Sequence, residues 1–233
     1  MKKGKLIVID GTDGSGKATQ VKLLVDSLKK EGHKVKILDF PEYYSNFFGA
    51  FIGHCLSEQY YNFVKVHPKI ASVLYAADRF ETKEKIEKWL KEGNIVIANR
   101  YASANQIHQG GKIANTKKRE AFIKWLAEME YEVFKIPKPD VVVYLSVPIP
   151  TVLKLIKERN KNQNRNYLGK KNNQKKDVHE KDVHFLENSR KSALWLAKTQ
   201  KNWIKIECVQ DGVLDTRENI HQKVYDKIKK ILK

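Results

Sequence analysis

The stretch KLIVIDGTDGSGKAT, residues 5–19, decides the fold. A short β-branched run from Leu6 to Ile9 predicts a buried strand, and a glycine-rich segment leads from it to Lys17. Glycines let backbone N–H groups turn inward, and the start of a helix adds partial positive charge. This order predicts a P-loop that binds ATP phosphates and an ATP-using phosphotransferase. The residues assigned to phosphate binding are Gly11, Asp13, Gly14, Ser15, Gly16, Lys17, Ala18 and Thr19.

One position of this loop departs from the usual motif. The residue after the lysine is Ala18, where such loops usually carry Ser or Thr with a hydroxyl for Mg²⁺. The side chain of Thr19 points about 100° further round the helix. We still expect Mg²⁺ to accompany ATP, held chiefly by phosphates and water, because it neutralises charge in the transition state.

Short apolar runs alternate along the chain with amphipathic helical patterns. Their brevity and β-branched content predict five strands, at residues 6–9, 35–40, 95–98, 141–147 and 203–208. Strands that alternate with helices predict an α/β protein with three α/β/α layers and a five-stranded parallel sheet. Ligands of such sheets bind at the carboxyl ends of the strands.

Residues 161–176, KNQNRNYLGKKNNQKK, break this pattern. The segment has six basic residues, no acidic ones and almost no apolar side chains, so it cannot bury a face. One interpretation is a disordered surface loop, and the other is a mobile lid that closes over phosphates and excludes water. Its place between two helices favours the lid. We expect a single domain over residues 1–233 with a lid insertion at about 160–178.

Bulk composition narrows the class of protein. The chain has 233 residues and two cysteines, Cys55 and Cys208, without metal-ligand spacing, which favours a reducing, cytoplasmic compartment. No apolar run is long enough for a membrane span or a signal peptide. The formal net charge is +18, but 38 of the 45 basic residues are lysines spread over nearly every predicted helix. We therefore expect a solvated basic surface with an anion site, and nucleic-acid binding is the less favoured alternative.

Four further motifs occur in a fixed order along the chain. They are residues 40–43 (FPEY), 74–80 (LYAADRF), 99–110 (NRYASANQIHQG) and 177–180 (DVHE). With the P-loop they resemble the thymidylate kinases from residue 5 to about 215. The resemblance implies the P-loop kinase fold, the reaction ATP + dTMP ⇌ ADP + dTDP and a homodimer. The helices around 71–77 and 122–134 carry apolar surface that suits either a dimer face or the core.

The resemblance also implies substrate contacts. Arg79 would contact the thymine and Arg100 the acceptor phosphate, although a surface ion pair is the alternative for each. Tyr75 would stack on the base or be an ordinary core aromatic, and Asn105 would hydrogen-bond a pyrimidine edge. Asp13 would accept from the sugar hydroxyl. The remaining assigned contacts are Phe40, Tyr43, His108, Gln109, Asp177 and His179, and for His108 a purely structural histidine is an equal alternative.

Two versions of this family differ in where they carry a catalytic arginine. This P-loop contains no arginine, whereas Arg159 and Arg165 flank or enter the lid, so the chain resembles the version with lid arginines. Arg159 would also stack on adenine, with residues 209–214 on the other side. The predicted catalytic residues are Lys17, Arg100, Arg159 and Arg165.

The chain departs from the family pattern at three positions of residues 99–110. The acid that opens the motif is Asn99, its serine is Ala104, and its tyrosine before Gln109 is His108. Asp10 is a candidate to supply the missing carboxylate to Mg²⁺ through water. Two alternative functions follow: a kinase of another (deoxy)nucleoside monophosphate, and a non-catalytic nucleotide-binding module.

Overall fold

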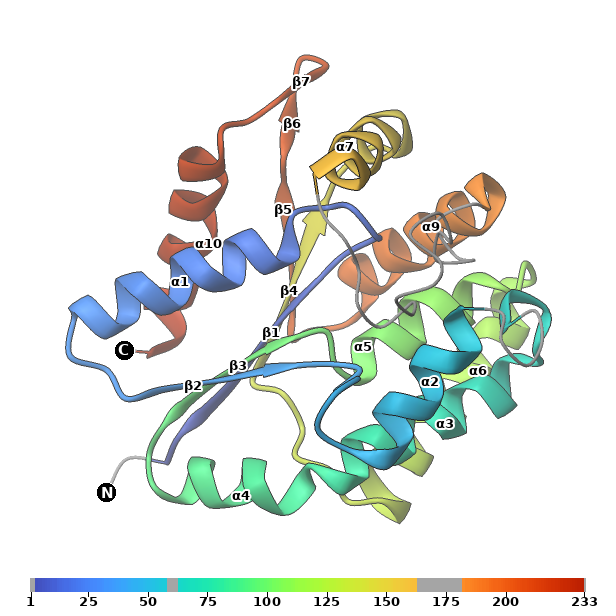
Figure 1. Ribbon diagram of the computed structural model, residues 1–233, viewed down its shortest axis with the longest axis horizontal. Helices are drawn as coiled ribbons and strands as arrows, with labels where there is room; N and C mark the ends of the chain where they lie inside the picture. The colour runs from blue at the N-terminus through green and yellow to red at the C-terminus, as the bar shows by residue number, and fades with distance from the viewer. Residues whose placement is uncertain (1–2, 58–62, 163–181, 233) are drawn as a thin grey trace.

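A five-stranded parallel sheet lies at the centre of the computed structural model, which describes residues 3–57, 63–162 and 182–232 (Figure 1). The strand order is β2-β3-β1-β4-β5, and each neighbouring pair runs parallel. The five predicted strands and the α/β class are confirmed. The strands are β1 (Lys5–Asp10), β2 (Val35–Asp39), β3 (Ile95–Asn99), β4 (Val141–Ser146) and β5 (Trp203–Glu207).

Helices cover both faces of the sheet. Side chains alternate along β1, so Ile7 and Ile9 belong to one buried cluster and Leu6 and Val8 to the other. Figure 1 shows α1 and α10 on one side of the sheet and α9 on the other. The first face is covered by α1 (Lys17–Lys30) and α10 (Arg217–Leu232). The second face is covered by α4 (Lys83–Lys91), α6 (Thr116–Ala127) and α9 (Val183–Thr199).

The remaining elements lie outside the sheet and the helices that cover its two faces. Two of them, η2 and η3, are π-helical, a geometry that often marks functional positions. Helices α2 and α3 pack on each other around a separate small core. These elements are α2 (Phe47–Leu56), η1 (Phe63–Lys65), α3 (Pro68–Glu81), α5 (Ala102–Ala104), η2 (Asn105–Gln109), η3 (Glu128–Val133), α7 (Ile149–Asn162), β6 (Val209–Gln210) and β7 (Val213–Leu214).

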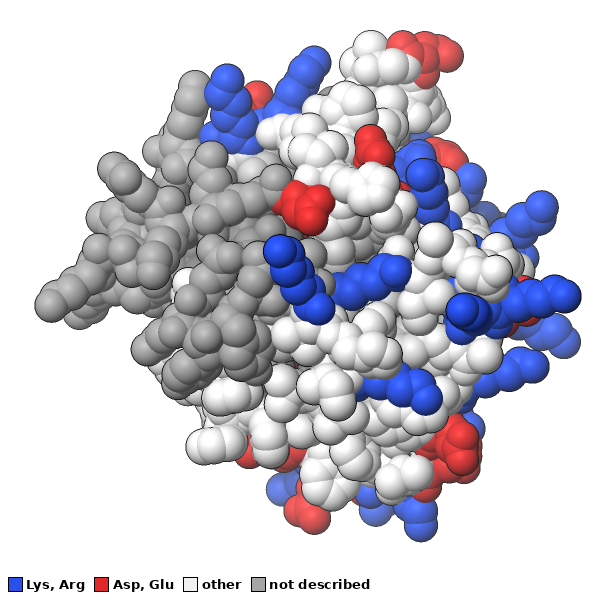
Figure 2. Space-filling model, turned by 90° about the vertical axis from the view of Figure 1, so that its right-hand side faces the viewer, with Lys and Arg blue, Asp and Glu red and all other residues white. Residues whose placement is uncertain are grey.

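The predicted lid lies almost entirely outside the described residues. Helix α7 continues to Asn162, so residues 160–162 are helical, and residues 163–178 are not among those described. Within the described ranges, no helix is long and apolar enough to cross a membrane. On the face drawn in Figure 2, Lys and Arg side chains are scattered with Asp and Glu among them and form no continuous stripe.

Candidate active site

Two glycines with positive φ shape the P-loop. Gly14 has φ 82° and Gly16 has φ 85°, a left-handed region that other residues enter only at a cost. Gly16 is the N-cap of α1, so the loop leads directly into the helix. A Cβ on Gly14 would lie 2.7 Å from Cγ1 of Ile156 on α7. The absence of a side chain at Gly14 therefore lets the loop pack against the helix that leads to the predicted lid.

The amino group of Lys17 lies folded over this loop. It donates to the carbonyl oxygens of Gly11 at 3.1 Å and Thr12 at 3.0 Å. Loss of hydration and the charge of Arg100 lower its pKa to about 8, against the opposing charges of Asp13, Asp10 and Asp39. Only 7% of the residue is exposed. Lys17 is thus a buried cation that a triphosphate would stabilise.

Arg100 approaches the P-loop from the end of β3. Its φ is 63°, unusual for a residue with a side chain, and its N–H donates to the Ile9 carbonyl at 3.0 Å. The guanidinium forms an ion pair with Asp13, and its buried Nη1 has no hydrogen-bond partner among the described residues. Burial opposes the charge of Arg100, but Asp13 and Asp10 raise its pKa above the usual range. The strained backbone therefore presents a permanent cation to the loop.

Three polar side chains at the strand ends complete this edge of the site. Asp10 is fully buried, and its Oδ1 accepts from the Gly11 N–H at 2.8 Å while its Oδ2 accepts from the Ser103 hydroxyl. Asn99 does not face Asp10, since its Nδ2 donates to Oδ1 of Asp39 on the neighbouring strand at 2.8 Å. The buried Oδ1 of Asn99 has no partner among the described residues.

These groups suit Mg²⁺, which retains water and takes few protein ligands. The carboxylates of Asp10 and Asp39, at the ends of the two strands that flank β3, and the Asn99 amide oxygen, which lacks a partner among the described residues, are oxygen donors that a hydrated cation beside phosphates can use. Within the described residues, no group of three or more His, Cys, Asp or Glu side chains is arranged to hold a metal ion.

The predicted base contact, Arg79, lies in a buried network. Its Nε donates to Oε2 of Glu130 at 2.8 Å, its Nη2 pairs with the other carboxylate oxygen, and 1% of the residue is exposed. Asn105 donates from Nδ2 to the same Glu130 at 3.0 Å and to the Ser72 carbonyl at 3.1 Å. The network joins α3, η2 and η3. Arg79 and Asn105 are therefore brought together, with a buried carboxylate between them.

Aromatic residues predicted to line the acceptor site fall into two groups. Phe40 is 3% exposed, and its ring lies 5.5 Å from that of Tyr101, inside the main core. Tyr43 and Tyr75 are only partly buried and flank the small core of α2 and α3, where the Tyr75 ring lies 5.7 Å from that of Phe63. Tyr43 and Tyr75 therefore keep surface that a substrate can contact.

The last predicted acceptor residues pack against α9. Nδ1 of His108 lies 3.2 Å from the Ser189 hydroxyl, and its ring stacks on Phe185 with centroids 5.9 Å apart. Gln109 is 1% exposed, and its side-chain oxygen has no hydrogen-bond partner among the described residues. The part of the predicted acceptor site around His108 thus depends on α9, a helix that the motifs did not include.

Comparison with known proteins assigns the family. Residues 9–220 match the family model described as thymidylate kinase. The chain belongs to the thymidylate kinase family. It is 34% identical over 147 residues to thymidylate kinase of Plasmodium falciparum, which covers 63% of each chain, and 30% identical over 154 residues to the human enzyme, covering 66% of each. These alignments thus span just under two thirds of the relatives' length.

A solved structure supports the fold across nearly the whole chain. Thymidylate kinase from Candida albicans superimposes with a TM-score of 0.71 at 20% identity, covering 98% of this chain and 92% of that one. That kinase of Candida albicans has a broad substrate specificity and a novel structural element.

Four further residues were predicted for the site of this thymidylate kinase family member. Arg159 lies partly exposed near the end of α7, among the described residues. Arg165, Asp177 and His179 lie outside the described residues. The 209–214 segment forms a small antiparallel hairpin of β6 and β7.

Sequence reasoning missed three polar side chains that the structure places in this region. Asp39 ends β2 and Glu130 lies on η3, both outside the quoted motifs, whereas Ser103 lies on α5 within the motif of residues 99–110. Asp39 directly precedes the FPEY motif, so its position at a strand end was a usable signal. For Glu130 the sequence contains no such signal, because its partner Arg79 is 51 residues away along the chain.

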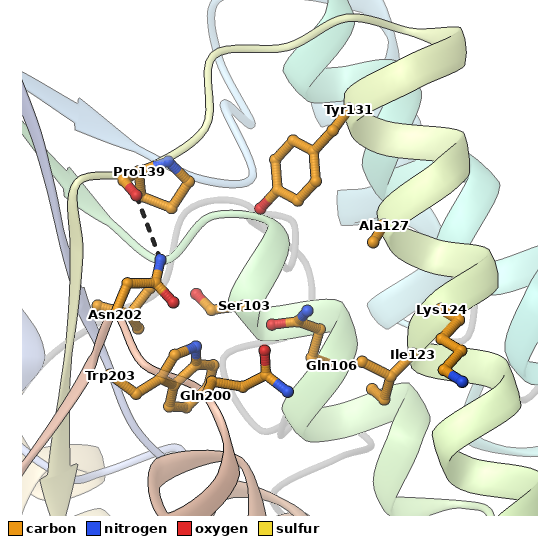
Figure 3. Close-up of a pocket in the computed structure, with 11 residues that line it drawn as sticks. Ser103, Gln106, Ile123, Lys124, Ala127, Tyr131, Pro139, Gln200, Asn202 and Trp203 are labelled. Atoms are coloured by element: carbon orange, nitrogen blue, oxygen red, sulfur yellow. Dashed lines mark hydrogen bonds between the residues drawn. The ribbon is translucent and has the colours of Figure 1, made fainter.

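A separate cavity of about 220 Å³ is lined by residues of α5, η2, α6 and η3 and by residues at the starts of β4 and β5 (Figure 3). Figure 3 shows Gln106 and Ser103 near its centre, with Tyr131 opposite and Gln200, Asn202 and Trp203 on the side of β5. Ser103 connects this cavity to the P-loop strand, since its hydroxyl donates to Asp10.

Proposed function

We propose that this protein transfers the γ-phosphoryl group of ATP to dTMP and forms ADP and dTDP. One observation carries the proposal: Lys17 at the start of α1 and Arg100 just after β3 converge on Asp13 in a P-loop of a thymidylate kinase family chain. An acceptor phosphate is already ionised near pH 7, so no strong general base is required. Catalysis is then positioning and charge stabilisation, which buried cations supply.

The two cations act on different phosphates. Lys17 leaves the Gly11 and Thr12 carbonyls and follows the β- and γ-phosphates, because an anion offers stronger, charge-assisted hydrogen bonds. Arg100 binds the acceptor phosphate through Nη1, which has no partner among the described residues, while Asp13 fixes the other side of the guanidinium. Mg²⁺, when bound with ATP, neutralises charge on the β- and γ-oxygens. Arg159 and Arg165 complete the clamp from the lid side in this proposal.

The acceptor base lies, in this proposal, between Tyr75 and the buried network. Nε and Nη2 of Arg79 are committed to Glu130, which leaves Nη1 as the group that reaches a base carbonyl. Asn105 is held by the same carboxylate, so Glu130 sets the orientation of both side chains. Phe40, Tyr43, His108 and Gln109, with Asp177 and His179, shape the rest of the acceptor pocket. A homodimer in the cytoplasm is the proposed setting.

The test is a coupled ADP-release assay with ATP, Mg²⁺ and each nucleoside monophosphate in turn. A strong preference for dTMP is expected. Turnover with another monophosphate would retain the mechanism and change the substrate. If ATP binds and no monophosphate is turned over, the proposal is overturned in favour of a nucleotide-binding module.

A further inference from the structure

The end of β2 places a carboxylate beside the P-loop helix. In the parallel register, Asp39 of β2 is the partner of Asn99 of β3, and Asn99 in turn lies opposite Ile9 of β1. Nδ2 of Asn99 donates to Oδ1 of Asp39 at 2.8 Å, while Oδ2 has no hydrogen-bond donor among the described residues. Asp39 is exposed. The carboxylate is thus fixed on one side and accessible on the other.

Side-chain alternation decides which face this pair lies on. Val35, Ile95 and Ile97 pack in the cluster that contains the buried side chains of α1. Residues two and four positions further along the same strands lie on the same face. Asp39 and Asn99 therefore lie on the α1 face, where the P-loop leads into its helix.

The charges of the site reach Asp39 as well. Partial loss of hydration raises the pKa of Asp39, and the charges of Arg100 and Lys17 oppose that rise. Asp10 differs, because it has no exposed surface and each of its oxygens already accepts a hydrogen bond. Of these two carboxylates, only Asp39 offers an exposed oxygen to water.

A triphosphate at this loop requires a divalent cation, and the residue after Lys17 is Ala18, which has no hydroxyl for it. Mg²⁺ in proteins keeps several waters and is commonly anchored through one or two carboxylates besides phosphates. We propose that Asp39, oriented by Asn99, anchors the hydration shell of the Mg²⁺ that accompanies ATP. This inference rests on the proposed function, since it presupposes ATP at the P-loop.

The test measures how much Mg²⁺ improves ATP binding. Calorimetry gives the affinity of ATP with Mg²⁺ and with EDTA, in the absence of an acceptor, for the wild type, Asp39→Asn, Asn99→Asp and the double variant. In Asp39→Asn we expect roughly a tenfold loss of the Mg²⁺-dependent gain. Its affinity for metal-free ATP stays equal or rises, because a negative charge near the phosphates is removed. The double variant returns the carboxylate to the neighbouring strand and recovers most of the gain.

Asp26→Asn is the matched control, because it removes one negative charge from an exposed position of α1. The inference is overturned if Asp39→Asn keeps the gain of the wild type, or if it binds ATP more weakly with EDTA as well. A double variant that recovers nothing would also overturn it. If the wild type itself bound no ATP, the proposed function would fail first; turnover of dTMP with an unaffected Asp39→Asn would refute the Asp39 role alone.

Discussion

The phosphate half and the acceptor half of this site are built differently. In the phosphate half, Lys17, Gly14 and Gly16 belong to one loop, and their geometry follows from φ angles and a helix start. In the acceptor half, Arg79, Asn105 and Glu130 come from three elements and meet only in the folded chain. A local motif thus fixes the first half, and tertiary packing fixes the second.

The difference shows in the partners of the two arginines. Within the part of the chain that the structure describes, Nη1 of Arg100 has no hydrogen-bond partner, as suits a phosphate ligand. Arg79 is committed to Glu130 in the core and resembles a structural ion pair as much as a base contact. Substitutions in the phosphate half should therefore reduce turnover, and those in the Arg79 network should reduce stability as well.

The largest expected effect is on turnover. Lys17→Ala removes the cation that follows the transferred phosphoryl group, so kcat should fall by about 10³-fold. The melting temperature should not fall, because the substitution also removes the free-energy cost of keeping a charged ammonium group away from water. Steady-state kinetics checks this, with Lys22→Ala as the control at an exposed position of α1. A Lys17→Ala variant with wild-type turnover would contradict the assignment of the phosphate half to catalysis.

The next effect concerns stability in the acceptor half. Glu130→Gln leaves the Arg79 charge buried and unpaired, which should cost about 3–5 kcal/mol of unfolding free energy. Denaturant unfolding measures this, and Glu128→Gln, exposed on the same π-helical segment, is the control. Replacing both partners, by Arg79→Met with Glu130→Leu, should restore much of the stability. If Glu130→Gln kept the unfolding free energy of the wild type, the Arg79–Glu130 pair would not stabilise the fold.

The comparison also explains what the sequence could predict. The five strands were predictable because short β-branched runs alternate with helical patterns, and the P-loop because its residues are contiguous. Glu130 was not, since no spacing rule links residue 130 to residue 79. The role of Asp39 depends on the register between β2 and β3, which the strand pattern alone does not set. The predicted contacts Arg165, Asp177 and His179 lie outside the described residues and stay predictions.

A smaller effect is expected where the phosphate half meets the cavity of Figure 3. Ser103→Ala removes a donor to the buried Asp10, which should cost about 1–3 kcal/mol of unfolding free energy, because one carboxylate oxygen then lacks its partner. Denaturant unfolding at pH 7 and at pH 5 measures the cost. Loss of this bond also raises the pKa of Asp10 further, so the cost should be smaller at pH 5. An equal cost at both pH values would contradict this reasoning.

The smallest expected effect is the uptake of protons by Lys17 when ATP binds. The pKa of Lys17 is lowered to about 8 by loss of hydration and by Arg100, and bound phosphates should raise it again. At a pH between about 8 and the usual lysine value, roughly 10.4, ATP binding should therefore take up protons. Calorimetry in two buffers of different ionisation enthalpy measures this uptake, and Lys17→Met should abolish it. Proton release, or equal uptake in the Lys17→Met variant, would contradict the proposal that bound phosphates raise the lowered pKa of Lys17.

The most direct test of the central claim is a single-turnover measurement of dTDP formation from ATP and dTMP, in the wild type and in Arg100→Ala. Rapid chemical quench separates phosphoryl transfer from product release. With enzyme in excess over ATP, we expect dTDP to form in one exponential phase in the wild type, and transfer to be slowed by at least about 10²-fold in Arg100→Ala even at saturating dTMP. Equal transfer rates in the two proteins would contradict the proposal that Arg100 aligns the acceptor phosphate with the P-loop.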